Sequence, residues 1–222
     1  YVAGGKGKPQ TVPIGKDGSQ TAPTNPLFSL QLTPSLQKEW VRLPDFPGPA
    51  RVQPVLTAQQ SEDGIRLYLA GGFQPASAHQ EAIVCTEMLS YHPKTKQWRN
   101  EGFLPSLAGG SHRTVTGGCA IASGDSSILL VGGVNYDRFR DALNYPEPDY
   151  LLHPADWYKF NTSLLQYNTF TKHWTHLGNY EELARAGAGI ANNANTVIII
   201  GGELKPGIRT PEVNAFKLTR HP

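Results

Sequence analysis

The sequence has 222 residues and a formal net charge of +2 at pH 7, with 17% charged and 39% hydrophobic residues. This length and composition allow a sizeable core, in one large domain or two small ones. The near-neutral charge gives no support for binding to nucleic acid or to an anionic membrane, and no apolar segment approaches the ~20 residues of a membrane span.

The chain opens with Tyr1-Val-Ala-Gly-Gly5, which reads as the end of a core strand. No signal peptide is visible there, and we expect the natural start of the protein to lie elsewhere. The 23 glycines and 18 prolines predict many turns and hence many short strands. The two cysteines, Cys85 and Cys119, are too few for a disulfide framework, and we expect two buried thiols.

Apolar stretches that end in a glycine pair recur along the chain about 60–70 residues apart: Val2-Ala-Gly-Gly5, Leu67-Tyr-Leu-Ala-Gly-Gly72, Leu129-Leu-Val-Gly-Gly133 and Val197-Ile-Ile-Ile-Gly-Gly202. Between the pairs lies a second recurring segment, seen as Leu89–Trp98, as Leu165–Trp174 and, more weakly, as Leu30–Trp40. Each copy predicts a hairpin whose second strand opens at Trp. Such repetition indicates units that bury their faces against neighbouring units.

Four strands are expected in each full unit. We predict them at 51–60, 65–73, 82–91 and 97–103, at 111–122, 127–134, 163–167 and 173–177, and at 186–191, 196–203 and 213–218. The β-branched run at Thr196–Ile200 predicts a strand buried on both faces.

The order of Gly-Gly, Tyr and Trp resembles the kelch repeat of β-propellers, whose unit has ~50 residues. The excess length here is assigned to two insertions: a Gly-, Pro- and Ser-rich loop at Lys6–Pro26, and residues 135–160. Because the second insertion is dense in aromatic residues, we expect it to pack as a short helical flap over one face.

The predicted fold is therefore an all-β, kelch-type β-propeller in which residues 1–222 form one incomplete domain of about three to four blades. Propellers close into rings of ~4–8 blades. We expect further blades from additional sequence or from a second chain.

Several chemistries find no support. The glycine pairs lack the spacing of a phosphate-binding loop, and no serine lies in the GxSxG motif of a nucleophile elbow. His173 and His176 have the spacing of metal ligands, but no other ligands are in view. Neither a metal nor a cofactor is therefore predicted. The remaining candidates lie on loops before or after the inner strands, which meet at one end of a propeller's central channel. They are Arg51, His112, Asn135, Arg185, Glu203 and Arg209.

Glu203 and Arg209 directly follow the last glycine pair and are separated by a Pro-Gly bend. An Arg guanidinium binds a carboxylate bidentately, and a partly enclosed Glu transfers protons. An ion pair that only steadies the turn is the alternative.

The segment Glu203-Leu-Lys-Pro-Gly-Ile-Arg-Thr210 resembles the Gly-Glu-x-Lys-Pro-Gly-x-Arg-Thr segment of the N-acetylneuraminate epimerase (sialic acid mutarotase) family. Similar matches occur in the same order at Phe46–Arg51, His92–Thr95 with Trp98, Gly132–Asn135 and Leu164–Tyr167 with Trp174. The resemblance therefore spans roughly Trp40 to Leu218. The long loop at Lys6–Pro26 has no counterpart in the family pattern. Some members of the family are cyclically permuted, and this chain would suit the C-terminal part of such a member.

This resemblance implies a six-bladed propeller that interconverts the α and β anomers of a sugar acid, in the periplasm or outside the cell, without a cofactor. It implies that Glu203 moves protons and that Arg209 holds the substrate carboxylate. Arg51, His112, Asn135 and Arg185 are second candidates for substrate binding. One alternative is a non-catalytic kelch module that binds protein or glycan on the same face. Another is a copper radical oxidase, for which the sequence lacks a convincing set of His and Tyr ligands.

Overall fold

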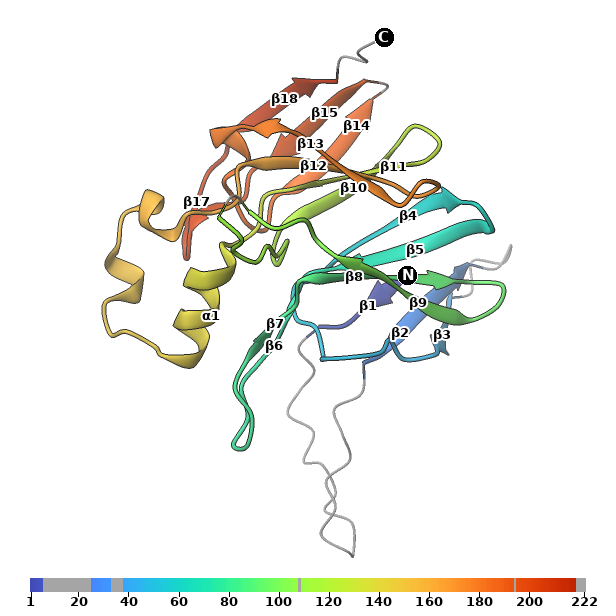
Figure 1. Ribbon diagram of the computed structural model, residues 1–222, viewed down its shortest axis with the longest axis horizontal. Helices are drawn as coiled ribbons and strands as arrows, with labels where there is room; N and C mark the ends of the chain where they lie inside the picture. The colour runs from blue at the N-terminus through green and yellow to red at the C-terminus, as the bar shows by residue number, and fades with distance from the viewer. Residues whose placement is uncertain (6–24, 33–37, 108, 194, 219–222) are drawn as a thin grey trace, which may run out of the picture.

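The computed structural model describes residues 1–5, 25–32, 38–107, 109–193 and 195–218. In this part of the chain four antiparallel sheets stand side by side, each twisted relative to the next (Figure 1). Two small hairpins and a helical segment extend from one end of the sheets. The arrangement confirms the prediction of an all-β, kelch-type propeller. The predicted loop at Lys6–Pro26 lies, apart from its last two residues, outside the described residues.

We number the sheets as blades in chain order. Blade 1 contains β1 (Val2–Ala3), β2 (Leu27–Leu32) and β3 (Lys38–Leu43); blade 2 contains β4 (Val55–Ser61), β5 (Gly64–Ala70), β8 (Glu87–His92) and β9 (Gln97–Phe103). Blade 3 contains β10 (Cys119–Ser123), β11 (Ser127–Val131), β12 (Ser163–Asn168) and β13 (His173–Asn179); blade 4 contains β14 (Gly189–Asn193), β15 (Thr196–Ile200) and β18 (Val213–Lys217). The hairpins pair β6 (Phe73–Gln74) with β7 (Ile83–Val84) and β16 (Glu203–Lys205) with β17 (Ile208–Arg209).

The second strand of each central blade is buried because neighbouring blades cover both of its faces. In β5, Leu67 and Leu69 pack toward blade 1, whereas Tyr68 packs with blade 3. In β11, Leu130 joins the same cluster as Tyr68, while Leu129 packs with Val197 and Ile199 of blade 4. Successive side chains of a strand point to opposite faces of the sheet, so one continuous apolar run packs against the blades on both sides.

Strand β15 differs from this expectation. Val197 and Ile199 are buried, but Ile200 is 47% exposed, so the run at Thr196–Ile200 is not buried on both faces. The reason is that no other sheet of the described residues packs against that side of blade 4.

The recurring Tyr and Trp form cross-strand pairs in the two central blades. Tyr91 lies opposite Trp98, with ring centroids 5.1 Å apart, and Tyr167 lies opposite Trp174 at 4.8 Å. Paired aromatic rings of this kind stabilise adjacent strands. The recurring Tyr and Trp of the sequence therefore correspond to the same cross-strand contact in blade 2 and in blade 3.

The first glycine of the pair allows a close approach to the next blade in blades 1, 2 and 3. Gly132 has a φ of +66°, and a Cβ placed on it would lie 2.6 Å from the carbonyl oxygen of Arg185, just before blade 4. The equivalent Cβ on Gly4 would lie 2.3 Å from the carbonyl oxygen of Arg51. Both backbone strain and backbone overlap therefore require glycine here.

We expect Gly132→Ala to lower the free energy of unfolding by roughly 3 kcal/mol or more, measured by urea denaturation, because strain and overlap combine. Gly187→Ala is the matched control, since Gly187 has a φ of +63° but no atom lies within 4 Å of the position that a methyl group would take there. It should cost only the strain, about 1–2 kcal/mol. Equal losses in the two variants would contradict the packing explanation.

Blades 2 and 3 are also joined by a buried carboxylate. Glu101 in β9 accepts hydrogen bonds from Ser90 (2.5 Å), from Nε of Arg99 (2.7 Å) and from the hydroxyl of Tyr167 in blade 3 (3.1 Å). Burial raises the pKa of Glu101, but these hydrogen bonds and the Arg99 charge outweigh it and hold the pKa below its usual value.

Because the folded-state pKa is lowered, ionised Glu101 stabilises the fold above its unfolded pKa, and this contribution is lost as the pH falls through the folded value. We expect Glu101→Gln to lower the free energy of unfolding at pH 7 by about 1–3 kcal/mol and to reduce the loss of stability between pH 7 and acid pH. Urea titrations at several pH values test this, with Glu62→Gln in the exposed β4–β5 turn as control. A constant difference between wild type and Glu101→Gln at all pH values would contradict it.

The insertion at 135–160 contains α1 (Tyr136–Asn144) and two short 3₁₀ turns, η1 (Tyr150–Leu152) and η2 (Ala155–Tyr158). The side chain of Asn135 caps α1 by accepting a hydrogen bond from the backbone of Arg138 (3.1 Å). Tyr158 and Phe160 are buried with Val134, and Ala184 and Ala186 before blade 4 pack against them. Aromatic packing thus holds the insertion on the end of the blades, beside both hairpins (Figure 1).

The described helices are short: α1 has nine residues, and within the described part of the chain no helix has the length and apolarity to cross a membrane.

Candidate functional site

The loops before the inner strands and the loops after the second strands meet at one end of the blades, which we call the loop end. The inner strand β10 contacts both of its neighbours, β4 and β14. Their preceding loops form a hydrogen-bonded series, in which Gly117 N donates to Gln53 O (3.0 Å) and Gly187 N donates to Gly117 O (2.6 Å). This end is therefore a rigid platform for the side chains that extend from it.

Glu203 and Arg209 lie opposite each other in the β16–β17 hairpin at the loop end. The hairpin is attached to the loop before blade 4, because Glu203 N donates to Ala186 O (2.7 Å) and Ala186 N donates to Glu203 O (3.0 Å). The Nε of Arg209 is 3.5 Å from Oε1 of Glu203. The side chain of Arg209 is 81% exposed and that of Glu203 is 32% exposed.

A long, exposed ion pair of this kind contributes only ~0–1 kcal/mol to stability. The guanidinium is accessible to an anionic ligand, and the carboxylate beside it can accept a proton and, once protonated, pass it on. The geometry thus brings together the two residues that the sequence singled out, and it is compatible with acid–base chemistry on a bound carboxylate.

Lys205 connects this hairpin to the insertion. Its Nζ donates to the carbonyl oxygen of His153 (2.6 Å) and lies 3.3 Å from that of Leu151. The hairpin is therefore held on one side by blade 4 and on the other by the insertion.

His112 and Asn135 are also placed at the loop end. His112 is exposed and its ring contacts that of Tyr136, which follows Asn135, with centroids 5.1 Å apart. The carbonyl oxygen of the Asn135 side chain caps α1, which leaves the amide group of this side chain for other contacts. The two residues are therefore available beside the start of the insertion.

Arg51 and Arg185, predicted from the sequence as second candidates for substrate binding, are buried in the structure. The guanidinium of Arg51 is fully buried, where it donates to the carbonyl oxygen of Gly71 (2.9 Å) and pairs with Glu87. Arg185 repeats this arrangement in blade 4: it donates to the carbonyl oxygen of Gly201 (3.1 Å) and pairs with Glu212 (3.3 Å). Both arginines hold the glycine pair and the third strand of their own blade together, and we leave them out of the proposed site.

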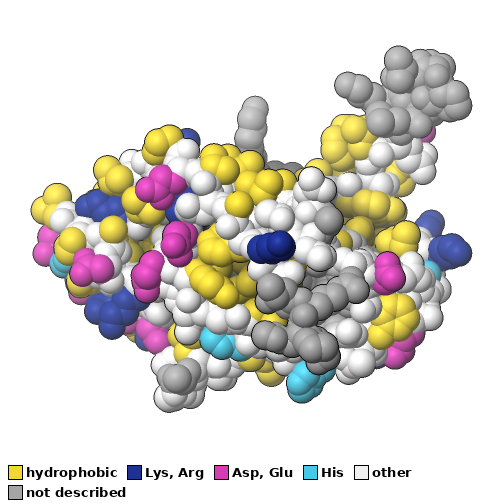
Figure 2. Space-filling view, turned by 90° about the horizontal axis from the view of Figure 1, so that it is seen from above, with side chains coloured by type: hydrophobic (Ala, Val, Ile, Leu, Met, Phe, Trp, Pro, Cys, Tyr) yellow, Lys and Arg dark blue, Asp and Glu magenta, His cyan; other side chains and the backbone are white. Residues whose placement is uncertain are grey.

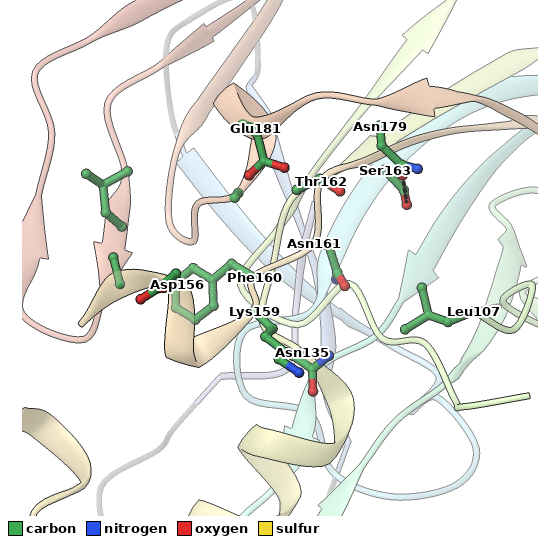
Figure 3. A pocket seen from close by; sticks show the side chains of 13 residues that line it. Leu107, Asn135, Asp156, Lys159, Phe160, Asn161, Thr162, Ser163, Asn179 and Glu181 are labelled. Atoms are coloured by element: carbon green, nitrogen blue, oxygen red, sulfur yellow. Dashed lines mark hydrogen bonds between the residues drawn. The ribbon is translucent and has the colours of Figure 1, made fainter. Parts of the chain in front are cut away.

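A cavity of about 630 Å³ lies between the insertion, the start of β12 and the hairpin (Figure 3). We call it the insertion cavity. Its lining residues are Leu107, Asn135, Ala155, Asp156, Lys159, Phe160, Asn161, Thr162, Ser163, Asn179, Glu181, Ala184 and Leu204. Glu203 and Arg209 do not line it, although Leu204, which follows Glu203, does.

The two cysteines are free, buried thiols, as the sequence predicted. Burial raises the pKa of Cys85 to about 11 and that of Cys119 to about 11. Neither is a thiolate at neutral pH, and neither is suited to act as a nucleophile.

Sequence reasoning missed a cluster of possible metal ligands in the insertion, formed by Glu147, Asp149 and His153, whose ligand atoms lie within 4.8 Å of one another. Both acidic residues are exposed, and the His153 ring stacks on Trp157 with centroids 3.9 Å apart. We assign this cluster no role.

Fold and site together define a kelch-type β-propeller with an acid and a guanidinium paired on its loop end. The model of the N-acetylneuraminate epimerase family matches residues 10–221. The chain belongs to this family.

Individual relatives agree with this assignment. The N-acetylneuraminate epimerase of Pasteurella multocida is 27% identical over 216 residues, which cover 90% of this chain and 52% of the relative. That of Haemophilus influenzae (strain PittEE) is 30% identical over 192 residues, covering 82% and 48%. A solved structure of YjhT has a TM-score of 0.69 at 27% identity and covers 88% of this chain and 56% of that one. The chain thus spans about half the length of the curated relatives it matches.

Proposed function

We propose that this chain carries the acid–base site of a sialic acid mutarotase, which interconverts the α and β anomers of N-acetylneuraminate or a related sugar acid without a cofactor. The observation that carries the proposal is the cross-strand pair of Glu203 and Arg209 on a hairpin held at both sides. Membership of the N-acetylneuraminate epimerase family supports the same substrate class.

The reaction needs only proton transfer. Sialic acid carries its carboxylate on the anomeric carbon, and the ring opens when the anomeric hydroxyl loses a proton and the ring oxygen gains one. The hydroxyl electron pair forms the ketone while the bond from the anomeric carbon to the ring oxygen breaks. Reclosure on the other face of the ketone reverses each transfer, so that protons and electrons balance.

In this scheme Glu203 takes the proton from the anomeric hydroxyl and delivers a proton to the ring oxygen, directly or through water. Arg209 binds the substrate carboxylate and keeps the anomeric carbon beside Glu203. His112 and the amide of Asn135 are further candidates for contacts with substrate hydroxyl groups. Further blades, from additional sequence or from a second chain, would complete the ring around this site.

The proposal is tested by anomer-resolved exchange NMR on N-acetylneuraminate with catalytic amounts of the chain. Exchange between anomers should be faster than in buffer alone, and an unchanged rate with intact, folded chain would contradict the proposal for these 222 residues.

A second candidate is a non-catalytic module that binds a protein or glycan at the loop end. It is favoured by the exposed apolar side chains of the insertion, where Tyr145 is 65%, Leu151 60% and Leu152 81% exposed. Binding of N-acetylneuraminate with no acceleration of anomer exchange would favour this candidate over the first.

A further inference from the structure

The insertion cavity has a built polar wall on the side of blade 3. Asn161 is buried, and the two N–H groups of its Nδ2 are shared among three carbonyl oxygens, those of Thr114 (2.8 Å), Gly132 (3.1 Å) and Val134 (3.1 Å). The amide orientation is therefore fixed, and Oδ1 is left as a positioned acceptor on the cavity wall.

Asn179 supplies the complementary group. Its Oδ1 accepts from the hydroxyl of Ser163 (2.9 Å), and the His176 ring lies 3.1 Å from the same oxygen. This arrangement leaves the two N–H groups of Nδ2 as donors. Figure 3 shows Asn161, Thr162, Ser163 and Asn179 along one side of the cavity. A fixed acceptor and a fixed donor on a rigid sheet end are suited to vicinal hydroxyl groups.

The charges around the cavity do not favour an anion. Asp156 and Glu181 contribute two carboxylates, whereas Lys159 contributes one ammonium group. Basic and acidic side chains are also interspersed over the left part of the face in Figure 2. Apolar surface comes from Leu107, Phe160 and Leu204. A volume of about 630 Å³ lies within the range of small-molecule sites.

We propose that the insertion cavity binds an uncharged, hydroxyl-rich sugar. The inference rests on the proposed function for the sugar class of the ligand, and it adds a binding site that is separate from the Glu203–Arg209 pair. The two sites share a wall, because Leu204 of the hairpin lines the cavity. Lys205 fixes the distance between this wall and the insertion through its bonds to His153 and Leu151.

The test is a titration of the isotope-labelled chain with N-acetylmannosamine, an uncharged sugar, followed by amide shifts in two-dimensional NMR. We expect saturable shifts at residues 159–163 and 179–184. Ala155 is exposed and lines the cavity, so Ala155→Phe should fill the cavity without disturbing the core and should weaken this binding at least tenfold. Leu152→Phe is the matched control, because Leu152 is 81% exposed in the same insertion but does not line the cavity.

The test distinguishes failure of this inference from failure of the proposed function. An uncharged sugar needs no guanidinium, so Arg209→Ala should leave the shifts intact, even if N-acetylneuraminate proves not to be a substrate. Absence of saturable shifts at 159–163 and 179–184 in the folded wild type would overturn the inference. Equal affinity in Ala155→Phe and Leu152→Phe would also overturn it.

Discussion

Glu203→Gln is expected to slow the interconversion of sialic acid anomers by ~10²–10⁴-fold while the affinity for N-acetylneuraminate stays within about threefold of wild type. Gln keeps the shape and hydrogen-bonding capacity of Glu but cannot take up a proton at neutral pH. The hydrogen bonds that attach the hairpin to Ala186 are made by the backbone of Glu203, so the substitution leaves them in place.

Exchange NMR gives the rate, and a calorimetric titration gives the affinity. Glu62→Gln is the control, because Glu62 is an exposed acid in the turn between β4 and β5, at the far end of blade 2 from the hairpin. An unchanged rate in Glu203→Gln would remove the catalytic assignment. Equal loss of rate and affinity would instead assign Glu203 to substrate binding.

Arg209→Ala is expected to weaken binding of N-acetylneuraminate by roughly tenfold to more than a hundredfold, because hydrogen bonds to a charged group contribute about 1.5–3 kcal/mol. The fold should be unaffected, since the side chain is 81% exposed and its contact with Glu203 is long. Calorimetry with N-acetylneuraminate and with its methyl ester separates the charge effect from other contacts.

The ester should bind wild type and Arg209→Ala with similar affinity. Arg140→Ala is a suitable control, because Arg140 is an exposed arginine at the same end whose partners are Asp137 and Asp141. A similar loss of affinity for acid and ester in Arg209→Ala would show that Arg209 does not hold the carboxylate.

Most of the fold could be predicted from the sequence because each blade repeats the same local requirements. The glycine pairs are needed where the backbone approaches the next blade, as at Gly132 and Arg185, and the Tyr and Trp residues meet across adjacent strands. These requirements act at fixed positions within each unit, so they leave a periodic signal. The exposure of Ile200 could not be predicted, because burial of that side depends on a neighbouring sheet and not on the strand itself.

The candidate site was only partly predictable. Glu203 and Arg209 were found because a short segment with a Pro-Gly bend separates them, which places them across a hairpin. Arg51 and Arg185 were placed on the right loops, but a loop position does not show which way a side chain turns. Both turn inward because Glu87 and Glu212 begin or precede the third strands of their blades, a pairing between residues far apart in the sequence.

The insertion cavity left no signal that a single sequence could reveal. Asn161 precedes β12, Asn179 ends β13, and Leu204 belongs to the hairpin that follows β15 in blade 4. Asn161 occupies the same position in blade 3 as Asn25 in blade 1. Each lies two residues before the strand that follows the glycine pair of its blade, and each donates hydrogen bonds to nearby carbonyl oxygens.

The measurement that bears most directly on the central claim is a crystal structure of the chain with N-acetylneuraminate bound. The account predicts the sugar at the loop end, with its carboxylate on the guanidinium of Arg209 and its anomeric hydroxyl or ring oxygen within hydrogen-bonding reach of Glu203. A sugar bound at the opposite end of the blades, or at the loop end with its carboxylate away from Arg209, would contradict it.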